Sequence, residues 1–242
     1  MENKGREGRG KARAGFRNRE HNKDGRLGSD GNRNRQPKGG TARDAALFAL
    51  TNVIQNGAYA SIALNRQLRE RPLSEEDRRL ATNIFYLAAE NRLRLEYALM
   101  RFLNTRPDPT IWDILHIAAA QILYMDRVPD HAAVDEAVKQ ARAAKREGLT
   151  GMVNGVLRNL VRAKEAGESL LPDPETDRIR YISVANSLSE HLVRRLAEAY
   201  GLEEAEKIAA WRPVGRVQTL RPNLMQTSVE AFGAYLTERK IT

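Results

Sequence analysis

Apolar residues recur every three to four positions from Thr41 onward, which is the period of an α-helix with one buried face. Thr41 is a candidate N-cap for the first such stretch, and Gly57 is a candidate stop. A second, short helix is expected over residues 61–70, and Ser74 followed by three acidic residues marks the start of a third. The pattern predicts an almost entirely helical protein.

The apolar positions over residues 78–103 fit either one long helix or two helices separated by a kink near Asn91. Asp108 and Pro109 then form a cap followed by proline at the first helical position. The helix that follows is apolar on almost all sides, so we expect it to lie at the centre of the fold. His116 lies within it and is expected to be a core histidine with its hydrogen bonds satisfied.

Two further helices are expected after this central one. Asp130 is a candidate cap for the first, Gly148 ends it, and Thr150 or Gly151 begins the second. Both helices carry an inward apolar stripe. They would complete a helical bundle over residues 41–167.

The pattern changes after a polar linker that ends at Asp173 and Pro174. Ser187 and Glu190 have the spacing of a capping box, and Gly201 closes the helix that they begin. The only strand is predicted over residues 216–221. A second capping box at Thr227 and Glu230 opens a final helix. One strand and one helix cannot close a core, so residues 168–242 are interpreted as linker helices and the start of a truncated α/β subdomain.

Charge is concentrated in the first 40 residues. They hold nine glycines, twelve Lys or Arg and five Asp or Glu, and the whole chain carries a net charge of +9. Such a segment buries too little apolar surface to offset its chain entropy, so residues 1–40 are predicted to be a disordered basic tail. Its cations suit contact with phosphates. The alternative is a solubilising extension without a specific partner.

Basic residues also align on the last two helices of the bundle. Residues three, four, seven or eight apart share one helix face, so these cations are placed to grip successive phosphates. The alternative is a solvated face with local pairs such as Asp135 with Lys139. Asn154 is expected to support packing rather than to contact RNA. The candidate RNA-binding residues, including two in the tail and one at the start of the first helix, are Arg35, Lys38, Arg43, Lys139, Arg142, Arg146, Arg158 and Arg162.

Two stretches resemble known families. The runs from Val128 to Lys139 (VPDHAAVDEAVK) and from Gly151 to Leu160 (GMVNGVLRNL) resemble the last two helices of the NusB fold. The run from Tyr200 (YGLEEAE) and the later LRPN ending at Asn223 resemble the link to the catalytic domain in Sun-type (NOP/Sun) bacterial 16S ribosomal RNA cytosine-5 methyltransferases. The resemblance implies an all-α NusB-like helical bundle that binds ribosomal RNA. It also implies S-adenosylmethionine as cofactor of the full-length parent.

The catalytic chemistry of that family is not expected in this chain. In the family a cysteine thiolate attacks cytosine C6, and this chain contains no cysteine. A glycine-rich turn between strand and helix is also missing, and the four histidines lack metal-ligand spacing. We therefore expect no catalytic residues, no cofactor site and no metal within the chain.

The sequence also bears on where in the cell the protein works. No apolar run approaches the roughly 18 residues needed to cross a membrane, and no secretory signal follows the basic N-terminus. A cytoplasmic protein without a membrane partner is expected.

Two other functions remain open. The first is a stand-alone NusB-like transcription antitermination factor, which would also bind a ribosomal-protein partner. The second is an assembly protein whose helical domain binds protein while the tail alone touches RNA. Deleting residues 1–40 separates this last case, because RNA affinity should then vanish.

Overall fold

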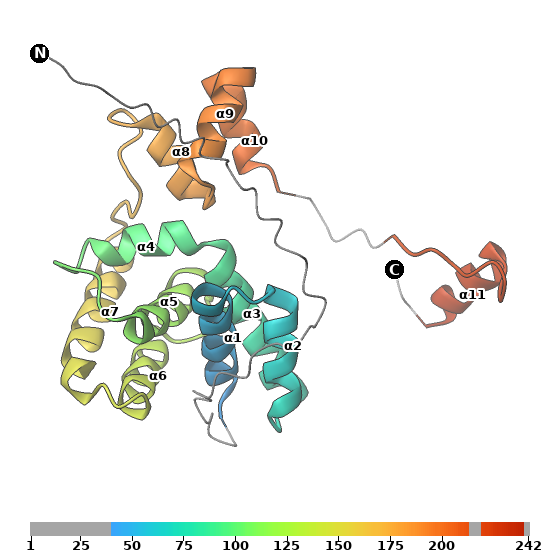
Figure 1. Ribbon diagram of the computed structural model, residues 1–242, viewed down its shortest axis with the longest axis horizontal. Helices are drawn as coiled ribbons and strands as arrows, with labels where there is room; N and C mark the ends of the chain where they lie inside the picture. Colours follow the sequence, from blue (N-terminus) through green and yellow to red (C-terminus); the bar gives the residue numbers. More distant parts are fainter. Residues whose placement is uncertain (1–39, 213–218, 240–242) are drawn as a thin grey trace, which may run out of the picture. The chain divides into compact units, whose positions relative to one another are not determined.

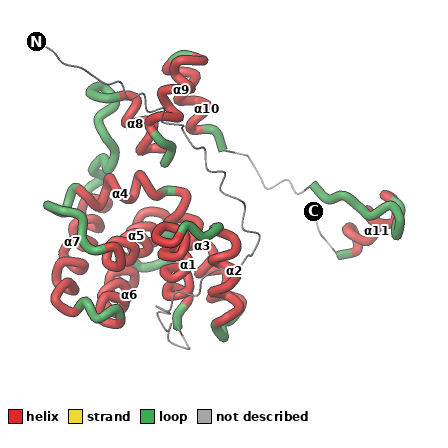
Figure 2. The backbone as a smooth tube through the Cα atoms, in the orientation of Figure 1, coloured by secondary structure: helices red, strands yellow, loops and turns green. Residues whose placement is uncertain are grey.

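The computed structural model describes residues 40–212 and 219–239, and all regular structure in these ranges is helical (Figure 1, Figure 2). The predicted all-α bundle is confirmed. The elements, in chain order, are α1 (Ala42–Asn56), α2 (Ala60–Glu70), α3 (Glu75–Glu90), α4 (Arg92–Met100), α5 (Pro109–Tyr124), α6 (Asp130–Ala143), the 3₁₀ turn η1 (Glu147–Leu149), α7 (Thr150–Glu165), α8 (Arg178–Asn186), α9 (Glu190–Tyr200), α10 (Leu202–Ala210) and α11 (Val229–Glu238).

Helix α5 is the centre of the bundle, as its apolar pattern predicts. It packs against α1, α3, α4, α6 and α7 (Figure 1). Every residue from Ile111 to Ile122 is buried. Asp108 caps the helix, because its Oδ1 accepts from the backbone N–H groups of Thr110 and Ile111 at 3.1 and 3.4 Å, and Pro109 occupies the first helical position.

Local signals fix the ends of α1 and the point where α3 gives way to α4. Thr41 and Asp44 form a capping box, and Gly57 ends α1 in the left-handed conformation with φ 66°. The open choice between one and two helices is decided at Asn91, where α3 ends and α4 begins. The Leu87 carbonyl at this end accepts from both the backbone N–H and the side-chain amide of Asn91, at 3.2 and 3.0 Å.

The start of α6 differs from the prediction. Asp130 is the first helical residue and not the cap, and Pro129 at the cap position supplies no side-chain hydrogen bond. Both carboxylate oxygens of Asp130 instead accept from Lys164 Nζ at 3.1 Å. This ion pair ties the start of α6 to the end of α7, which begins at Thr150.

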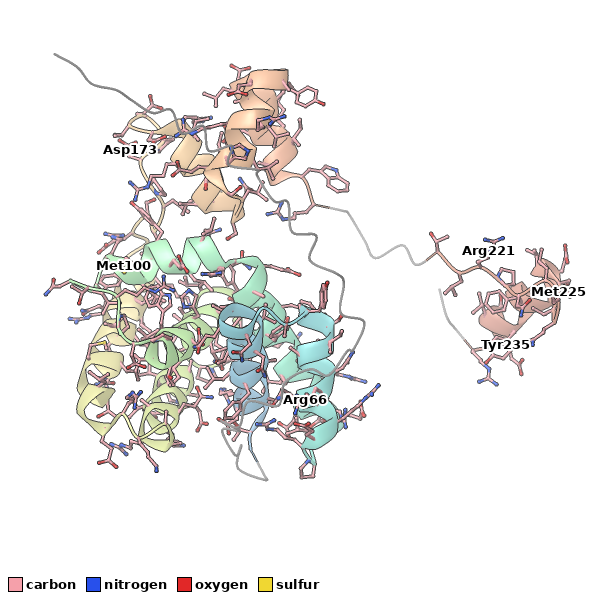
Figure 3. All side chains as sticks on the ribbon, in the orientation of Figure 1. Arg66, Met100, Asp173, Arg221, Met225 and Tyr235 are labelled. Carbon is pink, nitrogen blue, oxygen red and sulfur yellow. The ribbon has the colours of Figure 1, made fainter. Side chains whose placement is uncertain are left out.

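A second, smaller cluster of buried residues joins α8, α9 and α10. It contains Ile182, Val193 and Ala209. The Arg178 side chain of α8 pairs with Glu206 of α10 across this cluster. Before α8, Asp173 (labelled in Figure 3) caps a turn by accepting from Thr176 Oγ1 at 2.7 Å.

The predicted capping box at Ser187 and Glu190 is wrong. Ser187 has φ 52° and ends α8, a helix that was not predicted. The backbone N–H of Ser187 donates to the carbonyls of Ser183 and Val184 in that helix. Ser189 is the cap of α9 and accepts from the Leu192 N–H at 3.2 Å. Gly201 closes α9 as predicted.

The predicted strand is absent from the part of residues 216–221 that the structure describes. Residues 219–221 have no regular structure, and residues 216–218 lie outside the described ranges. A single strand has no neighbour to satisfy its backbone, so its apolar alternation alone does not form a sheet. The last helix, α11, is capped by Ser228 rather than Thr227.

Helix α11 exposes Val229 and Tyr235 and leaves Phe232 and Leu236 half-buried. It buries none of its side chains, and Met225, just before it, is 94% exposed (labelled with Tyr235 in Figure 3). The described helices include none that is both long enough and apolar enough to cross a membrane. The α/β subdomain and the division at residue 167 stay predictions.

Candidate nucleic-acid interface

A groove runs between α6 and α7 in the form of two adjoining hollows that share Asp135. The first has a volume of about 380 Å³ and the second about 730 Å³. The first hollow is lined by Asp135, Val138, Lys139, Arg142, Thr150, Gly151 and Asn154. The second is lined by Asp130, His131, Val134, Asp135, Arg158, Val161, Arg162 and Glu165. Four of the eight predicted RNA-binding residues therefore line one groove.

The α6 wall of the groove carries Lys139 and Arg142, both exposed. Lys139 Nζ donates to Glu136 Oε1 at 2.7 Å, so its local partner is Glu136 and not Asp135. This hydrogen bond raises the pKa of Lys139, which stays protonated. Within the described part of the chain, Arg142 has no carboxylate partner.

The α7 wall carries two arginines that are held by neutral amides. Arg158 Nε donates to Asn154 Oδ1 at 3.0 Å, and Arg162 hydrogen-bonds Asn159 Oδ1. An amide oxygen orients a guanidinium without neutralising its charge. Asn154 thus lines the groove and also orders Arg158.

Most other arginines whose side-chain partner is described differ from Arg158 and Arg162. Their partner is a carboxylate, which offsets the positive charge of the guanidinium. Those with a carboxylate within 4.0 Å are Arg66, Arg92, Arg101, Arg106, Arg146, Arg178 and Arg194. Arg142, Arg158 and Arg162 have no carboxylate within 4.0 Å among the described residues, a property they share with arginines elsewhere such as Arg78 and Arg79 of α3.

The two hollows differ in charge. The first combines two cations with one carboxylate, that of Asp135. The second adds Asp130 and Glu165, and Asp130 is engaged by Lys164. The end of the groove near Gly151 is therefore its most basic part.

Arg43 extends this basic surface to the start of α1. Its Nε donates to Gln121 Oε1 at 2.6 Å, and the buried Gln121 is fixed in turn by donating to the Ile117 carbonyl at 2.9 Å. Arg43 lies close enough to Lys139 to oppose the rise in the pKa of that lysine. Gln121 was missed by sequence reasoning, although a glutamine in an otherwise apolar helix was the available signal.

The remaining predicted residues lie elsewhere. Arg146 does not line the groove, and its Nε is 3.4 Å from Asp108 Oδ2 at the start of α5. Arg35 and Lys38 lie outside the described residues.

Two buried polar side chains of α5 have roles in the core. His116 Nδ1 is 2.8 Å from the Trp112 carbonyl and must carry the hydrogen, since a carbonyl only accepts. Its Nε2 has no hydrogen-bond partner, so the predicted fully satisfied histidine is wrong on this side. Asp113, which the apolar pattern concealed, accepts from Thr51 Oγ1 at 2.8 Å and Gln55 Nε2 at 2.7 Å, and burial raises its pKa.

In residues 40–212 and 219–239, no three or more His, Cys, Asp or Glu side chains are grouped so as to hold a metal ion.

The fold and the groove define an all-α domain with a basic groove between α6 and α7, the last two helices of its bundle. The family model that matches is "NusB family", over residues 40–162, and the chain belongs to this family. The probable ribosomal RNA small subunit methyltransferase B of Bacillus subtilis is 35% identical over 188 residues, which is 77% of this chain and 41% of the relative.

Other relatives carry the same name. The probable ribosomal RNA small subunit methyltransferase B of Synechocystis is 29% identical over 206 residues, 84% of this chain and 45% of the relative. The Thermus thermophilus ribosomal RNA small subunit methyltransferase B is 38% identical over 142 residues, 56% of this chain and 34% of the relative. The chain spans less than half the length of these relatives, and the match to the Sun-type methyltransferases agrees with the sequence resemblance.

Proposed function

We propose that this chain is the RNA-binding part of a small-subunit ribosomal RNA methyltransferase and that the α6–α7 groove contacts the phosphates of that RNA. The observation that carries the proposal is the set of groove arginines without carboxylate partners, Arg142, Arg158 and Arg162. Cations that neutralise phosphates supply most of the affinity of sequence-independent RNA binding. Guanidiniums held in place beforehand lose less conformational entropy on binding.

The extent of the similarity favours the methyltransferase over a stand-alone antitermination factor. The family model covers residues 40–162, whereas the Bacillus subtilis and Synechocystis matches cover 188 and 206 residues. The shared sequence therefore continues beyond the bundle into the linker helices. We assign methyl transfer from S-adenosylmethionine to cytosine C5 to the portion of the relatives that this chain does not match, and we place the protein in the cytoplasm.

The proposal is tested by measuring the affinity of the full chain for fluorescein-labelled fragments of small-subunit ribosomal RNA at several salt concentrations. Arg142→Gln, Arg158→Gln and Arg162→Gln should each weaken binding. Each should also lower the slope of log affinity against log salt by about one, because one phosphate contact is lost.

Arg194→Gln is the matched control. Arg194 is also an exposed helical arginine, but it pairs with Glu190 at 3.3 Å on α9. The Arg194→Gln variant should bind RNA with the same affinity as the unchanged chain. Groove variants that behave like this control would refute the proposal. Loss of all affinity on deleting residues 1–40, with no effect of the groove variants, would assign RNA binding to the tail.

A further inference from the structure

Two glycines lie on α7, and one of them, Gly151, lines the groove. Gly151 and Gly155 are four residues apart, and Arg158 and Arg162 continue the same stripe at helical spacing. Both glycines are exposed, and Gly151 lines the basic first hollow. The stripe therefore places two positions without side chains beside two arginines that amides hold in place.

The packing of the chain does not require glycine at either position. A Cβ atom built on Gly151 or Gly155 would meet no heavy atom within 4 Å, and neither residue has a positive φ. Glycine within a helix is destabilising relative to alanine, because the unfolded chain loses more conformational freedom. The two glycines thus weaken α7 with no compensating contact among the residues that the structure describes.

We propose that these glycines let the sugar–phosphate backbone of RNA lie directly against α7, between the arginines of the groove. The inference rests on the proposed function and specifies which part of the RNA the groove takes. Methyl groups at these positions would hold a strand away from the Arg158 and Arg162 guanidiniums. Neither hollow is lined by Phe, Tyr or Trp, so His131 in the second hollow is the one ring of the lining on which a base could stack.

A helix of another protein is the competing occupant, because glycines four apart also allow close helix contacts. The groove favours RNA. Apart from Gly151, its lining is polar or charged except for Val134, Val138 and Val161. Asp130, Asp135 and Glu165 belong to that lining, but none of them lies within 4.0 Å of a groove guanidinium, and Asp130 is paired with Lys164. A packed helix would have to desolvate these charges without pairing them.

The test replaces both glycines with alanine in the full chain and measures thermal stability and RNA affinity together. The Gly151→Ala, Gly155→Ala variant should melt at a higher temperature than the unchanged chain and yet bind ribosomal RNA fragments several-fold more weakly. Opposite signs for the two measurements exclude misfolding as the cause of weaker binding.

Gly233→Ala is the matched control, because Gly233 lies inside α11 and a Cβ there would also meet nothing within 4 Å. It should leave RNA affinity unchanged. Unchanged affinity of the double alanine variant, while Arg158→Gln still weakens binding, would overturn this inference and leave the proposed function standing. Unchanged affinity of both variants would overturn both. Alanine variants that lose self-association in sedimentation but keep RNA affinity would show that a helix occupies the groove.

Discussion

At the residue scale, His116 makes the stability of the core depend on pH. Burial lowers the pKa of its imidazole, and the positive charges of Arg92 and Arg106 lower it further, against the opposing effects of Glu96 and the Trp112 carbonyl. The folded-state pKa therefore lies below the unfolded value of about 6.5. As pH falls, the unfolded chain takes up the proton first, so this contribution to stability is complete above pH 6.5 or so and is lost below it.

The free energy of unfolding in urea should thus fall between about pH 7.5 and 5.5 by more in the unchanged chain than in His116→Gln. Subtracting the pH dependence of His116→Gln from that of the unchanged chain removes the effect of the carboxylates, because these titrate in both proteins. His131→Gln, at an exposed histidine of α6, should keep the full pH dependence. Parallel pH profiles for the unchanged chain and His116→Gln would show that Glu96, whose Oε1 is 4.0 Å from His116 Nε2, offsets the effect of burial on the pKa of His116.

The residues of the groove were predicted from helical spacing, but their partners were not. Positions 139 and 142, and positions 154, 158 and 162, share faces because an α-helix has 3.6 residues per turn. Some guanidiniums are neutralised by a carboxylate four residues away, as in Arg66 with Glu70, but others find their partner in a distant segment. The hydrogen bond from Arg43 to Gln121 and the ion pair of Arg146 with Asp108 span 78 and 38 residues, and no local pattern encodes them.

At the element scale, Asp108 has two roles, since it caps α5 and pairs with Arg146. The cap is the larger of the two, because an exposed ion pair contributes about 0–1 kcal/mol. Asp108→Ala should lower the free energy of unfolding by about 1 kcal/mol in urea denaturation. Asp108→Asn keeps the cap acceptor and removes only the charge, so it should remain close to the unchanged chain. Equal losses for the two variants would mean that the ion pair dominates.

The elements that sequence predicted well are those with short-range signals. Thr41, Ser74, Asp108, Gly57 and Gly201 begin or end their helices as expected, because caps act within one turn. Helix α8 was missed because its nine residues carry a weak apolar pattern and it packs against α4, α9 and α10, contacts that no local pattern encodes. Ser187 was misassigned because a serine in the left-handed conformation looks, in sequence, like a cap of the following helix.

At the scale of the whole molecule, recognition and chemistry are expected to be separable. The chain holds a basic groove but no cysteine, and the transfer assigned to its relatives' unmatched portion needs a nucleophile that ionises near neutrality. Incubated with labelled S-adenosylmethionine and small-subunit ribosomal RNA, the chain should bind the RNA and transfer no label.

A full-length relative, such as the Bacillus subtilis protein, is the positive control for that assay. The purified chain should also keep the same melting temperature when S-adenosylmethionine is added, because a ligand without a site does not stabilise the folded state. Label incorporated by the chain alone would contradict the division of roles, since it would require a nucleophile other than a thiol. If the chain binds RNA without incorporating label, and the groove variants lose that binding, recognition lies in the helical bundle and the chemistry lies outside this chain.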